Sequence, residues 1–160
     1  MFKCIKRFFR KSKPKVFIKM PYDYAIDEIG VKEIKGEKHN ARILEYHKYT
    51  NLNASTDEVP WCAAFVNYCL IKAGIEGTNK PNAKSFLDWG ISNPFPKRGD
   101  IVVFWRDSID SWKGHVGFYV DEDEEYIYCL GGNQDDSVSI KGYEKEKVLD
   151  FRTFNKVQYH

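Results

Sequence analysis

The chain has 160 residues, 42% hydrophobic and 16% aromatic, so it can fill one core but is too short for two ordinary domains. No run of about 18 apolar residues occurs, so we expect no membrane-spanning helix. The net charge of +2 conceals an asymmetry, because residues 1–15 hold seven basic residues and no acidic one. We therefore expect a basic N-terminal arm, residues 1–20, and one slightly acidic domain, residues 21–160.

In the arm, Phe and Ile are interleaved with Lys and Arg, without the apolar stretch and cleavage site of a secretory signal. The pattern is compatible with an anionic membrane surface, with nucleic acid, or with a solvated terminus. Of these we expect at most weak contact with an anionic membrane or cell envelope, and no nucleic-acid partner. We also expect synthesis in the cytoplasm.

Two short helices are predicted before residue 50. Ala25, Ile26 and Ile29 have helical spacing behind a capping Asp23, which predicts a helix over residues 23–29. Residues 41–47 place Ile43, Leu44 and His47 on one face of a second helix. The polar stretch 50–57 is typical of a loop.

A third, buried helix follows this loop, and Gly74 is expected to cap its C-terminus. Its apolar stripe consists of Cys62, Phe65, Val66, Cys69, Leu70 and Ala73. Pro60 suits the first turn, and Asp57 and Glu58 would complement the helix dipole. The same dipole favours the thiolate of Cys62, which makes it a candidate nucleophile, although an inert core thiol would show the same periodicity.

The remaining cysteines give no sign of a metal site. Cys4, Cys62, Cys69 and Cys129 lack the paired short spacing of zinc ligands, so we expect free thiols. Cys69 and Cys129 lie in apolar runs and are interpreted as structural.

Beyond residue 100 the period changes to that of β-strands. Strands are predicted at residues 101–105, 115–120, 125–130, 137–140 and 148–154. Arg98-Gly99-Asp100 is predicted as a turn, and residues 121–124 as a hairpin connection. Helices followed by a meandering antiparallel sheet indicate an α+β fold.

A nucleophile, a base and a residue that orients the base then occur in order, as thiol hydrolases require. Cys62 begins the buried helix, His115 begins a strand, and Asn133 follows the next strand. Gly114 and Gly117 would leave room for a substrate. Alternatively, His115 is a hydrogen-bonded core histidine and Asn133 an ordinary turn residue.

Four segments resemble, in order, motifs of the CHAP and NlpC/P60 group of papain-like peptidoglycan hydrolases. They are Pro60-Trp61-Cys62-Ala63-Ala64-Phe65-Val66-Asn67, Gly99-Asp100-Ile101-Val102-Val103-Phe104, Gly114-His115-Val116-Gly117-Phe118-Tyr119 and Gly131-Gly132-Asn133-Gln134. The likeness covers residues 22–154 and is nearest to small phage-type and bacterial cell-wall hydrolases. It implies a papain-like fold in which N-terminal helices precede a nucleophile helix packed on an antiparallel sheet.

The resemblance also implies a cysteine amidase or endopeptidase that acts on the peptide stems of peptidoglycan, as an endolysin or a secreted antibacterial effector. Cys62 would be the nucleophile, His115 the base and Asn133 the third catalytic residue, with Gln134 as second choice. Backbone N–H groups at the helix start would bind the oxyanion. No metal or organic cofactor is called for.

For substrate binding we expect Gln134 and an aromatic groove, although large aromatic residues are as typical of a core. The groove candidates are Trp61, Trp89, Trp112 and Tyr119. The same Cys and His would also suit an acyl transferase, and the aromatic residues a non-catalytic wall-binding module. We expect a monomer that acts in the periplasm or cell wall after secretion or lysis, with peptidoglycan and an immunity protein as partners.

Overall fold

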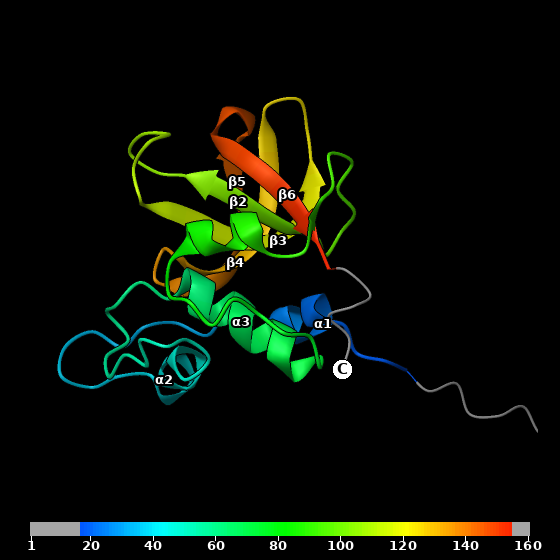
Figure 1. Cartoon of the computed structure of the whole chain (residues 1–160). Helices are drawn as coiled ribbons and strands as arrows, with labels where there is room; N and C mark the ends of the chain where they lie inside the picture. The colour runs from blue at the N-terminus through cyan, green and yellow to red at the C-terminus, as the bar shows by residue number, and fades with distance from the viewer. Residues whose placement is uncertain (1–16, 155–160) are drawn as a thin grey trace, which may run out of the picture.

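A computed structural model describes residues 17–154, in which three α-helices precede a six-stranded antiparallel sheet. The basic segment 1–15 and Cys4 lie outside the described residues. Figure 1 shows the helices on one side of the molecule and the curved sheet on the other, with α3 between α2 and the strands. The predicted α+β fold is thereby confirmed.

The helices agree with the sequence pattern apart from the first, which begins and ends two residues earlier than predicted. They are α1 (Pro21–Asp27), α2 (Ala41–His47) and α3 (Cys62–Lys72), followed by the 3-10 helix η1 (Ala83–Asp88). Asp23 does not precede α1 as its cap; it lies in the first turn, and its carboxylate accepts a hydrogen bond from the N–H of Met20 at 2.8 Å. Gly74 follows α3 with φ +77°, as expected for a residue that ends a helix.

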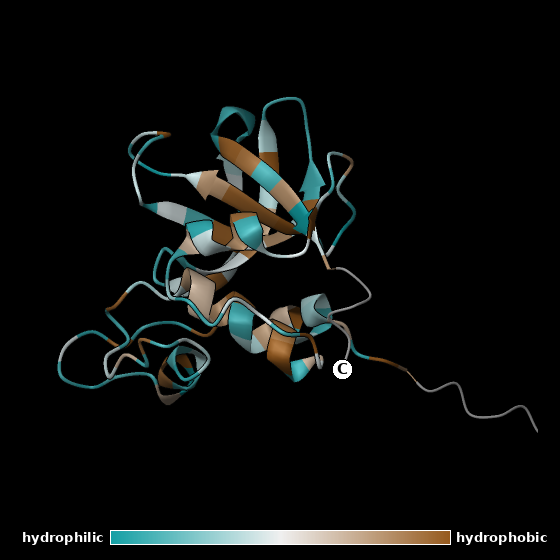
Figure 2. Cartoon of the chain, in the orientation of Figure 1, coloured by the Kyte–Doolittle hydropathy of each residue, from teal (hydrophilic) through white to brown (hydrophobic). Residues whose placement is uncertain are grey.

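The sheet has the order β1-β6-β2-β3-β4-β5, so the last strand lies between the first two. Its strands are β1 (Ile91–Ser92), β2 (Ile101–Trp105), β3 (Gly114–Glu122), β4 (Tyr126–Gln134), β5 (Ser137–Glu144) and β6 (Val148–Thr153), with the 3-10 helix η2 (Lys145–Lys147) between β5 and β6. In Figure 2, β2 is hydrophobic along most of its length, whereas β6 alternates between hydrophobic and hydrophilic residues. Both faces of β2 are therefore apolar, as is typical of a strand covered on both sides.

The core is divided by the sheet into two clusters. The larger joins α1, α2 and α3 to one face of the sheet and includes Val103, Val116 and Phe118. The smaller lies on the other face, where Phe104, Tyr119 and Cys129 pack together. Cys69 and Cys129 are free, fully buried thiols, in agreement with their interpretation as core residues.

The loop before α3 is held by Asp57, which is completely buried. Its carboxylate accepts hydrogen bonds from the N–H of Ile34 at 3.0 Å and of Asn40 at 2.8 Å, and Oδ1 lies 2.9 Å from His39 Nδ1. We expected Asp57 to complement the dipole of α3. Instead, its carboxylate oxygens bind Ile34, His39 and Asn40. Asp57 fixes the loop that leads to Cys62.

Among residues 17–154, no helix is both long and apolar enough to cross a membrane.

Candidate active site

Cys62 is the first residue of α3 and is only 6% exposed. Burial raises the pKa of its thiol, while the backbone N–H groups of Val116, Ala63 and Cys62 itself lower it. The dipole effect expected for a helix start is therefore present, but desolvation outweighs it. Because Val116 follows His115 directly, this interaction places the Cys62 thiol against the backbone of β3, one residue from His115.

His115, the second residue of β3, is 4% exposed and lies against two aromatic rings. Its imidazole stacks on Tyr143 with ring centroids 5.0 Å apart and planes at 21°. Phe104 stacks on the same two rings, at 4.6 Å from Tyr143 and 6.2 Å from His115. These contacts fix the plane of the imidazole. Tyr143 was not predicted from the sequence, because β5 reaches the site only through its pairing with β4.

Gln134 determines which nitrogen of His115 carries the proton. Its Oε1 lies 2.9 Å from His115 Nε2, and its Nε2 donates to the carbonyl oxygens of Cys129 at 3.2 Å and Ser139 at 2.6 Å. Since the amide N–H groups are committed to carbonyls, Oε1 must face the imidazole as an acceptor. His115 Nε2 is therefore the protonated nitrogen, and Nδ1 presents its lone pair.

Asn133, the expected orienting residue, has a different environment from Gln134. It has φ +56° and lies where the pairing of β4 with β5 is irregular, between Gly131 and Gln134. Asp135 and Asp136 follow with φ +52° and +61°, a two-residue turn between paired Gln134 and Ser137. The irregularity turns Gln134, which is 2% exposed, toward His115. Gln134, the second choice from sequence, therefore contacts the histidine.

Two glycines of β4 allow the helix and the sheet to approach at this point. A Cβ on Gly132 would lie 2.6 Å from Trp61 Cζ3 and 2.8 Å from Phe65 Cβ, so β4 packs directly on the start of α3. A Cβ on Gly131 would lie 2.7 Å from Gln134 Oε1 and 3.1 Å from His115 Nε2. The motif Gly131-Gly132 thus makes room for both the helix and the hydrogen bond.

Gly114 and Gly117 do not leave room for a substrate, contrary to expectation. A Cβ on Gly114 would lie 2.8 Å from the carbonyl oxygen of Phe104, and one on Gly117 would overlap Cys129 Sγ. Protein atoms already fill this space, so both glycines serve the packing of β3.

A cleft of about 620 Å³ opens beside His115. Its wall also contains Asn133 and Gln134, the aromatic residues Phe104, Trp105 and Tyr143, and Pro60 from the segment before α3. Charged residues complete it: Arg106, Asp107, Asp135, Asp136, Lys141 and Lys147. The cleft is therefore polar and carries both signs of charge.

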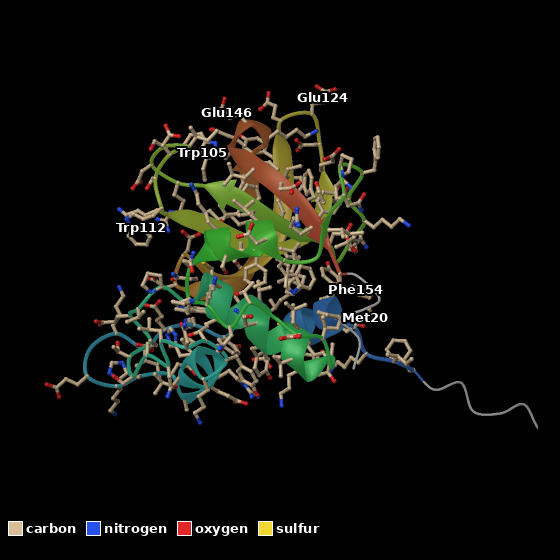
Figure 3. All side chains as sticks on the ribbon, in the orientation of Figure 1. Met20, Trp105, Trp112, Glu124, Glu146 and Phe154 are labelled. Carbon is tan, nitrogen blue, oxygen red and sulfur yellow. The ribbon has the colours of Figure 1, made fainter. Side chains whose placement is uncertain are left out.

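The aromatic residues proposed as groove walls lie elsewhere. Trp61 is fully buried and donates its indole N–H to Glu33 Oε1 at 2.8 Å. Tyr119 is 8% exposed and packs edge-on against Phe151, and Trp89 is 6% exposed. These three are core residues, as the alternative interpretation allowed. Trp112 is 75% exposed and, in Figure 3, projects from the outer edge of the molecule, on a loop next to the cleft residues.

The resting state of the pair follows from burial. Burial lowers the pKa of His115 to about 4. The hydrogen bond to Gln134 opposes this decrease, whereas the charges of Arg106 and Lys141 add to it. With the thiol pKa raised, Cys62 and His115 are both neutral near pH 7. Within residues 17–154, no group of three His, Cys, Asp or Glu side chains is arranged to hold a metal ion. The site is thus equipped for proton transfer from a thiol to a neutral imidazole.

An α+β fold with a cysteine at the start of its central helix and a histidine on the adjoining sheet defines a class of papain-like domains. The CHAP domain model matches residues 54–133, half of the chain, including Cys62 and His115, and the chain belongs to this family. The resemblance of the four sequence motifs to this family is thereby confirmed.

Among solved structures, one similar protein is from Staphylococcus aureus and is described as similar to a lipoprotein of the NLP/P60 family. The TM-score is 0.52 at 18% sequence identity, and the match covers 87% of this chain. It covers 42% of the Staphylococcus protein, so the two share a fold over less than half of the latter. A search of curated proteins finds no match.

Proposed function

We propose that this protein cleaves an amide bond in the peptide stem of peptidoglycan, as an amidase or an endopeptidase, through a thiol mechanism. The observation that carries the proposal is the hydrogen bond between His115 Nε2 and Gln134, 2.9 Å long, which leaves Nδ1 unprotonated. The N–H of Val116, the next residue of β3, interacts with the thiol of Cys62. The cleft beside His115 gives a substrate access to the imidazole, which a histidine with a purely structural role would not need. The family supports the substrate class.

The proposed reaction begins when His115 Nδ1 accepts the proton of the Cys62 thiol. The thiolate attacks the amide carbonyl, and the backbone N–H groups at the start of α3, including that of Cys62, stabilise the oxyanion. The imidazolium then returns its proton to the leaving amine. Water, deprotonated by the same nitrogen, releases the carboxylate product and restores the thiol.

In this reaction Gln134 would act through His115. Its carbonyl oxygen would accept the Nε2–H in every step, so that only Nδ1 exchanges a proton. Tyr143 donates its hydroxyl to the same oxygen at 3.2 Å and would hold the amide in place.

Hydrolysis and acyl transfer can be separated by digesting purified sacculi in ¹⁸O-labelled water. We expect each newly formed carboxyl group to contain one ¹⁸O atom, measured by mass spectrometry of the released fragments. Fragments joined to an added amine, without ¹⁸O, would instead identify a transferase. If no new fragments form although the protein still binds sacculi, the domain is a wall-binding module.

We further propose that the protein acts on the outer side of the cell membrane, where its substrate lies. There it would serve as an endolysin or as a secreted antibacterial effector. In the second case an immunity protein that covers the cleft would protect the producing cell.

A further inference from the structure

Three cations line the cleft beside His115, and two of them already have a partner. Lys141 pairs with Asp135 at 3.1 Å. Lys147 lies 4.0 Å from Glu144 and over the ring of Trp105, 5.7 Å from its centroid. Within residues 17–154, the guanidinium of Arg106 makes neither an ion pair nor a hydrogen bond.

The backbone holds Arg106 in place at the end of β2. Its N–H donates to the carbonyl of Lys113 at 3.3 Å, and its own carbonyl accepts from Ser108 at 2.7 Å. The neighbouring Asp107 has φ +63° and pairs with Lys113 at 3.0 Å. The carboxylate nearest in sequence is therefore paired with Lys113, and among the described residues no carboxylate forms an ion pair with Arg106.

The charge of Arg106 reaches the reacting pair. It lowers the pKa values of Cys62, His115 and Tyr143, as a cation close to all three must. A guanidinium remains charged at any physiological pH and presents paired N–H donors that match the two oxygens of a carboxylate. An unpaired guanidinium in a cleft, next to the reacting groups, is thus suited to an anion of the substrate.

We propose that Arg106 determines specificity by binding a free carboxylate of the substrate peptide near the bond that is cleaved. This inference rests on the proposed function. Wall peptides provide such groups as acidic side chains and chain ends, and amidation removes their charge at almost constant size. The enzyme would therefore discriminate between walls with free and with amidated carboxylates.

The test compares native sacculi with the same sacculi amidated by carbodiimide and ammonia. We expect wild type to digest the native sacculi faster by on the order of 10- to 100-fold, the range for hydrogen bonds to charged groups. Arg106→Gln should lose this preference by slowing only on native sacculi, and Arg106→Lys should restore part of it. Lys147→Gln, which removes one charge from the same cleft, should keep the preference.

Three results would overturn the role of Arg106. The first is that wild type digests both kinds of sacculi at the same rate. The second is that Arg106→Gln slows the digestion of both kinds equally, and the third is that Lys147→Gln loses the preference as completely as Arg106→Gln. Equal melting temperatures of the variants show that folding is not the cause. If the proposed function itself is wrong, the result is different, because wild type then releases no new amino groups from either kind of sacculus. That result would contradict both proposals.

Discussion

At the reacting pair, burial changes both pKa values so that the two groups stay neutral. It raises the pKa of the Cys62 thiol and lowers that of His115 to about 4. A preformed thiolate–imidazolium pair would require the opposite order of pKa values. Under the proposed mechanism, the thiolate is therefore a minor species of the free protein near pH 7 and is generated when His115 takes the proton.

This neutral state predicts how alkylation of Cys62 depends on pH. Only the thiolate reacts with iodoacetamide, so with the pKa raised above 9 the rate should rise about tenfold per pH unit from pH 6 to 9. The rate is measured by mass spectrometry of the peptide that contains Cys62. The fully buried Cys69 and Cys129 serve as internal controls. A rate plateau between pH 5 and 8 would show an ion pair instead.

A second prediction at this scale separates Gln134 from Asn133. Gln134→Ala removes the acceptor for His115 Nε2–H and should lower kcat by about 10- to 100-fold with little change in KM. Asn133→Gly, which keeps the positive φ of +56° accessible, should change kcat by less than about threefold. If Asn133→Gly causes the larger loss, the orienting role belongs to Asn133.

The elements meet where β4 crosses the start of α3, and a glycine allows the contact. Gly132→Ala would place a Cβ within 2.8 Å of both Trp61 and Phe65 and separate the helix from the sheet. We expect a loss of about 1–3 kcal/mol in the free energy of unfolding and a larger proportional loss of activity. Gly142→Ala in β5, whose nearest contact would be 3.4 Å, is the matched control. Similar effects of both substitutions on activity would contradict this role of the β4–α3 contact.

The loop before α3 gives a prediction about stability. Asp57→Ala removes both acceptor oxygens and leaves the N–H donors of Ile34 and Asn40 without a partner. Because the site is fully buried, the unsatisfied donors should lower the free energy of unfolding by about 2–3 kcal/mol in urea denaturation. The exposed neighbour Glu58→Gln should stay within about 0.5 kcal/mol of wild type. An unchanged free energy of unfolding for Asp57→Ala would show that the loop does not depend on this carboxylate.

Elements with a strong local pattern could be predicted from the sequence. The helical spacing of Ile43 and His47 gave α2 at its observed bounds, and the β-branched run Ile101–Trp105 gave β2. The short η1 and β1 could not be predicted, because Phe86 is held by burial in the core and Ile91 by pairing with Thr153. Their positions depend on distant residues.

The same limit applies to the site. Cys62 and His115 could be identified because each begins a regular element, and the structure places both at the α3–β3 contact. The choice between Asn133 and Gln134 depends on the irregular pairing of β4 with β5. The stacking of Tyr143 on His115 depends on the order of the strands in the sheet. Alternation along one strand carries neither kind of information.

For the molecule as a whole, the fold places Cys62 at the start of α3 and His115 on β3, both within the part of the chain that matches the CHAP domain. Met20 and Phe154, near the two ends of the described region, lie close together in Figure 3. They line a cavity of about 290 Å³ that shares no lining residue with the cleft beside His115.

The most direct measurement is the release of new amino groups from purified sacculi by wild type, Cys62→Ala and His115→Ala at equal concentration. We predict release by wild type and a loss of at least about 10³-fold in both variants, with unchanged melting temperature for Cys62→Ala. Release by folded Cys62→Ala at the rate of wild type would contradict the assignment of Cys62 as the nucleophile.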